Sequence, residues 1–240
     1  MMKSIGMTLV LAGAAAAHFA WIAPVTPVLT VGTAVQVQFG IGHELGISES
    51  APLLPGLQGY ALAPSGARTE LKPAKSGLWL NAEYTPKEAG QHRLVFTHDR
   101  GIRSRTPKGL VDGGRDKNPT ATQAFRGVRT AVAYALTANA KFEPKAVGLA
   151  YELVPQRTEK GVTVTLLFQG KPYAGGAVAV SWAGRKEVVL GKTGVDGKMS
   201  YVVPAGAKGP FVILAEQPIA TAKGSNYDTD NYETALYLNW

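Results

Sequence analysis

The stretch VTVTLLFQGKP, residues 162–172, decides the fold class of this chain. Apolar side chains recur at positions 162, 164, 166 and 168, which is the period-two pattern of a β-strand with one buried face. The residues that follow, Gln-Gly-Lys-Pro at 169–172, form a turn signal because glycine and proline interrupt regular structure. The stretch therefore predicts a strand that ends in a tight reversal.

Further short strands are expected downstream, at 178–182, 187–190, 199–203, 211–215 and 233–238. An Asp-Gly pair before the third of these marks another tight turn. Short strands separated by turn signals are typical of a β-sandwich of the Greek-key, Ig-like type, which we assign to residues 148–240. Its predicted core is made of inward-facing apolar residues: Val162, Val164, Leu166, Phe168, Val178, Val180, Trp182, Tyr201, Val203, Phe211 and Ile213.

The N-terminal part, residues 18–145, is predicted to be a second β-rich unit. Its clearest strand runs from Val35 to Ile41, and His43 continues the apolar face of that strand at its end. Strands are also expected at 92–98 and at 125–140, where the alanine-rich composition also permits a helix but the β-branched residues favour a strand. Residues 99–122 show no periodicity and are predicted to be a long loop. The predicted fold is thus mainly β, with two sandwich-like units.

Composition narrows the function classes. The 240 residues include 28 glycines and 15 prolines but no cysteine, so disulfides and thiolate ligands are excluded. Any metal must be held by histidine, carboxylate or backbone groups. The formal net charge is +8, with the excess between Arg93 and Arg129, and we interpret this region as a solvated basic surface. We expect no nucleic acid as a partner, because the chain carries an export signal.

That signal lies at the N-terminus. Lys3 precedes an apolar run from Ile5 to Ala17 that ends in small residues, which is the pattern of a secretory signal peptide at residues 1–17. The run is shorter than the ~20 residues that span a bilayer, and no later run is long enough for membrane insertion of the mature chain. We expect a periplasmic protein whose mature chain begins at His18.

A histidine at the first mature position has unusual chemistry. Its α-amine and its Nδ1 can chelate one metal ion together, and imidazole suits Zn, Cu, Fe and Ni. His43 could add a third nitrogen, which gives the arrangement called a histidine brace in copper proteins. His98 could supply a fourth ligand. On an extended strand His92 lies about 20 Å from His98, too far to share an ion with it.

Two stretches of the C-terminal unit, residues 168–178 and 193–198, resemble the carboxypeptidase-regulatory, transthyretin-like β-sandwich. The mature chain as a whole resembles a broad bacterial periplasmic family, some members of which are implicated as accessory components of energy-coupling-factor nickel or cobalt uptake. The matching motifs are His18–Pro24, Gly40–His43 and Ser104–Gly109. The family usually has an acidic residue directly after the first histidine, where this chain has Phe19.

This resemblance implies a periplasmic protein that serves a membrane transporter for Ni or Co uptake. We expect it to bind the ion through His18, His43 and His98. We expect no enzymatic activity, because neither a Gly-x-Ser-x-Gly elbow nor a Walker loop is present. Two alternatives remain open. One is a copper protein with a histidine brace, either a chaperone or an oxidase. The other is a metal-free β-sandwich module for adhesion or ligand binding.

Overall fold

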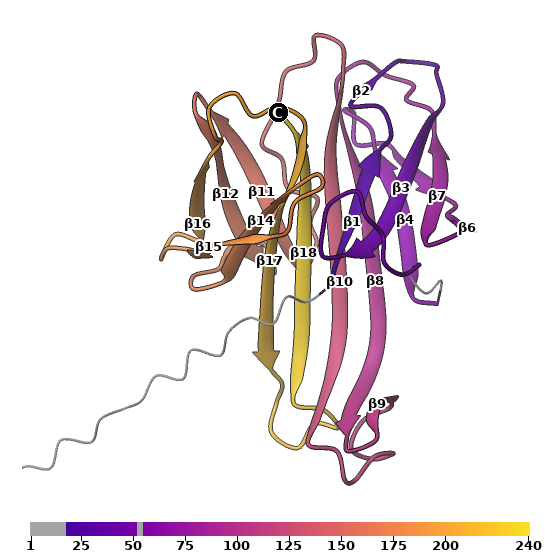
Figure 1. The fold of residues 1–240 in the computed structure, drawn as a ribbon, viewed down its shortest axis with the longest axis vertical. Coiled ribbons are helices and arrows are strands. Elements are labelled where there is room, and N and C mark those ends of the chain that lie inside the picture. The colour runs from indigo at the N-terminus through magenta and orange to yellow at the C-terminus, as the bar shows by residue number, and fades with distance from the viewer. Residues whose placement is uncertain (1–17, 52–54) are drawn as a thin grey trace, which may run out of the picture.

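A computed structural model describes residues 18–51 and 55–240, so the predicted signal peptide lies outside the described residues. Every regular element in the described part of the chain is a β-strand, which confirms the mainly β fold. The strands form three sheets in three layers, with a large sheet between two small ones (Figure 1).

The large middle sheet contains strands from both halves of the chain. Its strands, in spatial order, are β15 (Val188–Lys192), β14 (Ala177–Trp182), β17 (Pro210–Ala220), β18 (Thr229–Asn239), β10 (Gln123–Thr137), β8 (Gln91–Thr106), β4 (Leu57–Leu62) and β5 (Arg68–Leu71), while β2 (Val28–Leu29) pairs with β10 and β9 (Gly109–Asp112) pairs with β8. Strands β10 and β18 run parallel to each other.

Two four-stranded sheets cover opposite faces of the middle sheet. One contains β1 (Phe19–Pro24), β3 (Val35–Gly42), β7 (Trp79–Tyr84) and β6 (Ala74–Ser76) in that order. The other contains β11 (Tyr151–Thr158), β12 (Gly161–Phe168), β13 (Lys171–Pro172) and β16 (Lys198–Val202).

Side-chain alternation in the middle sheet builds two cores. Leu94 and Phe96 of β8 face the β1 sheet, whereas Val95 between them faces the β12 sheet. The same division recurs along β10, β17 and β18. Both faces of the middle sheet are therefore buried, and the two small sheets close a sandwich on each side of it. Of the eleven predicted core residues, eight are buried and Phe168, Trp182 and Tyr201 are partly buried against them.

Residues 138–150, where the boundary between the two predicted units falls, contain no strand. The middle sheet nevertheless continues across this point in the sequence, because β10 before it lies beside β18 after it. The division into units 18–145 and 148–240 stays a prediction.

The prediction of a long loop at 99–122 was wrong for much of its length. β8 continues to Thr106 and pairs with β9 and with the start of β10. This end of the sheet extends beyond both small sheets (Figure 1). Its side chains are mostly half-exposed, so no alternation between buried and exposed positions marks it in the sequence.

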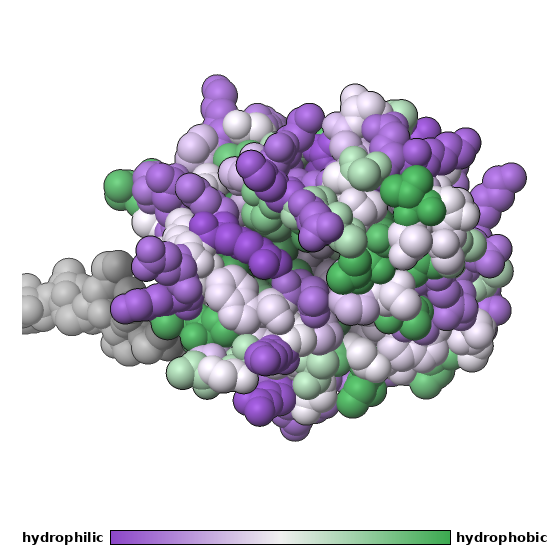
Figure 2. Space-filling view, turned by 90° about the horizontal axis from the view of Figure 1, so that it is seen from above, coloured by the Kyte–Doolittle hydropathy of each residue, from purple (hydrophilic) through white to green (hydrophobic). Residues whose placement is uncertain are grey.

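Some basic residues of this region form ion pairs with nearby acids. Arg103 pairs with Asp112, Arg115 with Asp228, and Arg126 with Asp99. The surface is mixed elsewhere as well: seen from above, hydrophobic areas are small and separated by hydrophilic side chains (Figure 2). No helix in the described residues is long and apolar enough to cross a membrane.

Candidate metal centre

The pairing of β1 with β3 brings the two predicted histidines together. Phe19 lies opposite Gly42 in this antiparallel pair, so the residue before β1 meets the residue after β3. These residues are His18 and His43, and their ring centroids lie 4.1 Å apart. Both side chains are partly exposed, His18 at 46% and His43 at 30%.

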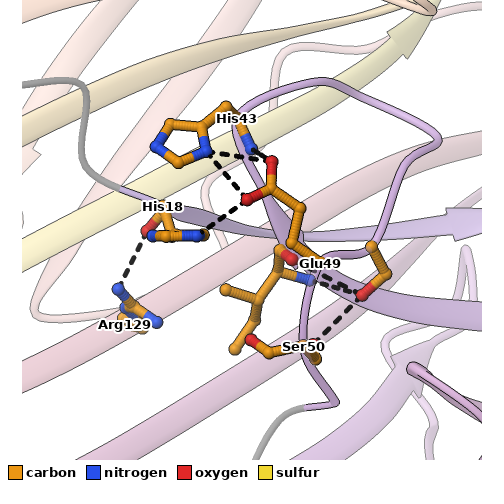
Figure 3. A network of polar contacts seen from close by, with 7 residues as sticks. His18, His43, Glu49, Ser50 and Arg129 are labelled. Carbon is orange, nitrogen blue, oxygen red and sulfur yellow. Dashed lines mark hydrogen bonds and ion pairs between the residues drawn. The ribbon is translucent and has the colours of Figure 1, made fainter.

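A carboxylate that was not predicted completes the group. The Glu49 carboxylate contacts both rings from one side, with Oε2 2.9 Å from His18 Nε2 and Oε1 2.9 Å from His43 Nδ1 (Figure 3). One ligand atom from each of His18, His43 and Glu49 lies within 4.8 Å of the other two. This spacing allows a shared ion after small side-chain movements, because late-transition ions hold such ligands at about 2.0–2.2 Å.

The turn after β3 fixes the position of Glu49. Its backbone amide donates to the Ile41 carbonyl at 2.8 Å. The Ser48 hydroxyl accepts from the Ile41 amide at 3.1 Å and donates to the Leu78 carbonyl at 2.7 Å. The chain thus reverses over the end of β3 and returns the carboxylate to His43. The family resemblance placed an acid beside the first histidine, and here the acid comes from a different strand end.

Hydrogen bonds from His43 hold the pKa of the Glu49 carboxyl below its usual range, with His18 adding a smaller effect. The carboxylate is therefore ionised at neutral pH and available as a ligand. A second acid, Glu187, lies near enough to His43 for their charges to interact. Burial raises the pKa of Glu187, and the charge of His43 opposes that rise.

The start of β1 is anchored to the middle sheet by an ion pair. Arg129 of β10 binds Glu233 of β18 at 3.0 Å, and both side chains are largely buried. Arg129 also donates to the His18 carbonyl at 2.8 Å (Figure 3), while Glu233 accepts from the Ala20 amide at 2.8 Å. These bonds fix the backbone at His18 and therefore the direction of its side chain.

His98 and His92 have different surroundings. His98 is 3% exposed and lines a cavity that His18 also lines, but it does not belong to the group formed with Glu49. Burial lowers the pKa of His98 to about 4, so this imidazole is neutral. His92 is fully buried between the Tyr84 hydroxyl at 2.7 Å and the Glu88 carbonyl at 3.0 Å, which is a structural role.

The structure thus defines an all-β protein with a His-His-Glu group at the edge of a sandwich. The model of a family described as "Domain of unknown function (DUF4198)" matches residues 15–217, and the chain belongs to this family.

One similar solved structure is a DUF4785 family protein from Legionella pneumophila. It shares 8% identity at a TM-score of 0.30, and the match covers 81% of this chain and 52% of that one. The chain therefore spans about half the length of that protein. A search of curated proteins finds no match.

Proposed function

We propose that this is a periplasmic metal-binding protein that holds one divalent late-transition ion, Ni or Co, at His18, His43 and Glu49. The observation that carries the proposal is the convergence of two imidazoles and an ionised carboxylate, contributed by the residue before β1 and by the turn after β3. Imidazole is a ligand for Ni, Cu and Zn, and a carboxylate adds the negative charge that a divalent ion attracts. His98 remains a candidate further ligand across the adjoining cavity.

The exposure of the group supports exchange of the ion. The three side chains are between 30% and 46% exposed, whereas structural zinc sites are closed by four protein ligands. Three side chains leave coordination positions open to water or to another molecule. These features suit a protein that buffers an ion or passes it to a membrane uptake system.

Copper is the second candidate, because the Irving–Williams order gives Cu²⁺ the tightest binding at nitrogen sites. In a histidine brace the first histidine would bind through Nδ1 and the α-amine. In the structure it is Nε2 of His18 that points to Glu49. This orientation favours the three side chains as the ligand set.

Calorimetry with Ni²⁺, Co²⁺, Cu²⁺ and Zn²⁺ on protein that begins at His18 tests the proposal. We expect one ion per chain and a large loss of affinity in His43→Ala. His92→Gln is the matched control, because its imidazole is bound elsewhere and should leave the affinity unchanged. Equal affinity in wild type and His43→Ala would favour the metal-free binding module.

A further inference from the structure

A cavity of about 200 Å³ adjoins the candidate metal centre. Its lining includes His18, Ser50, His98, Arg100 and Arg129. At ~30 Å³ for each water molecule, this volume accommodates a small organic acid group. The cavity is therefore large enough for a ligand that also reaches the ion-binding side chains.

Arg100 is the unusual residue in this cavity. Its guanidinium is half-buried, and across residues 18–51 and 55–240 it has neither a hydrogen bond nor an ion pair. The other arginines around it are engaged: Arg103 binds Asp112, Arg126 binds Asp99, and Arg129 binds Glu233. Burial, together with Arg129 and Arg103, lowers the pKa of Arg100 to about 10, which still leaves it charged at neutral pH.

An unpaired, partly desolvated charge is costly, and an arriving anion would remove much of that cost. Glu233 does not serve this purpose, because its carboxylate already binds Arg129 and the Ala20 amide. A second cavity, on the side of β18, is also lined by Arg100 and Arg129. Arg100 thus lines two cavities, and its donors have no hydrogen-bond partner among residues 18–51 and 55–240.

Loading the centre increases the local positive charge. A divalent ion beside Glu49 leaves one net positive charge, and Arg100 adds another, while Arg129 and Glu233 cancel each other. Carboxylates match the planar fork of a guanidinium, and a carboxylate oxygen is also a metal ligand. One such group could satisfy both charges.

We propose that this cavity binds a carboxylate that pairs with Arg100 and fills an open coordination position of the ion held by His18, His43 and Glu49. This inference rests on the proposed function and adds the chemical class of the co-ligand. The carboxylate has two sources: a free acid that joins the bound ion, or the arm of a chelate in which the ion arrives.

The test uses Co²⁺, because its visible absorption bands respond to the ligands around it. Protein that begins at His18 is first titrated with Co²⁺ alone, then with acetate, and in a separate series with Co²⁺ preformed in citrate. Acetate should change the bands of the cobalt-loaded wild type. Citrate that stays with the protein through gel filtration would identify the chelate as the source, whereas a response to acetate alone would identify the free acid.

Arg100→Gln should weaken acetate binding by about tenfold or more, the size of one hydrogen-bonded charge pair, and leave Co²⁺ binding in place. Arg100→Lys keeps the charge but lacks the planar fork, so its acetate affinity should lie between those of wild type and Arg100→Gln. It also replaces Arg100→Gln as the test variant if that variant folds poorly. Arg105→Gln is the control for charge, since Arg105 is exposed on the same strand and does not line the cavity.

Two results would overturn this inference alone. Cobalt could bind while its absorption bands respond to neither acetate nor citrate, or acetate could bind with equal affinity to wild type and Arg100→Gln. Absence of cobalt binding would overturn the proposed function with it.

Discussion

Glu49 accepts hydrogen bonds from both the backbone amide and the imidazole of His43, at 3.1 and 2.9 Å. In the proposed centre the carboxylate therefore has two roles: it offers a ligand oxygen, and it fixes the orientation of the His43 ring. A partner that orients a metal-binding histidine is commonly worth 10–100-fold in affinity.

We predict that Glu49→Gln weakens Ni²⁺ binding by about 10–100-fold, because the variant loses the ligand charge and the stronger bond to His43. Calorimetry at neutral pH measures the change. Glu83→Gln on the exposed side of β7 removes the same charge away from the site and should bind as wild type does. An unchanged affinity in Glu49→Gln would exclude this carboxylate from the centre.

The role of the α-amine can be tested separately from that of the side chains. We expect N-terminal sequencing of the exported protein to begin at His18. A variant with one alanine ahead of His18 converts the amine into a peptide nitrogen and leaves both imidazoles and Glu49 in place. Weaker Ni²⁺ binding in this variant is expected if the amine is a ligand, and equal binding would leave the three side chains as the complete set.

Glu233→Ala should lower the free energy of unfolding by about 2–4 kcal/mol, because it leaves Arg129 and the Ala20 amide without their partner. This range lies between the losses typical of an exposed ion pair and of a fully buried one. Urea denaturation measures the loss. Glu216 lies directly opposite Glu233 on β17 and is exposed. Glu216→Ala should therefore change stability by less than about 0.5 kcal/mol, and a similar loss in both variants would contradict the anchoring role.

Two buried histidines predict acid sensitivity. Burial lowers the pKa of His92, and it lowers that of His98 to about 4, so both are neutral in the folded protein. In the unfolded chain they take up protons near pH 6.5. Stability is thus fully present above pH 6.5 and falls as the pH drops towards 4, by at most about 1.4 kcal/mol per pH unit for each residue.

Denaturation of the metal-free protein at pH 7, 5.5 and 4.5 measures this slope. His92→Gln should reduce it, because glutamine does not titrate. A slope that is the same in His92→Gln and wild type would show that this histidine titrates alike in both states.

Gly40→Ala is expected to destabilise the protein by about 2 kcal/mol, because a methyl group at this position would overlap the buried indole of Trp21. Trp21 is in β1 and Gly40 in β3, so the change would also displace the strand ends that carry His18 and His43. Gly127→Ala on β10 places its methyl group at ordinary contact distance from Arg100 and provides the control. Thermal unfolding and Ni²⁺ affinity should both decline in the first variant only.

Local patterns in the sequence predicted most strands, because one face of each is buried. Alternation marked β3 and β12 clearly, and both lie where predicted. Alternation did not predict the C-terminal part of β8, because this part extends beyond both small sheets and has no consistently buried face. The parallel pairing of β10 with β18 also escaped prediction, since a strand's own residues do not specify which distant strand lies beside it.

The candidate site was predictable in part for a similar reason. His18 and His43 stood out as a residue ahead of one strand and a residue at the end of another. Glu49 gave no such signal, because its position depends on the reversal held by Ser48 and Ile41. Arg100 lay in a stretch taken for a solvated loop, and only the extended β8 places it beside the cavity.

The anchoring of β1 by Glu233 also sets the order in which the centre can form. Ala20 and Glu233 are 213 residues apart, so a chain that is synthesised from its N-terminus exposes the histidines long before their anchor exists. Such distant contacts form slowly during folding. The backbone at His18 reaches its final position only when β18 inserts between β10 and β17. The proposed ion-binding group is therefore assembled late, and a truncated chain would carry His18, His43 and Glu49 without the architecture that aligns them.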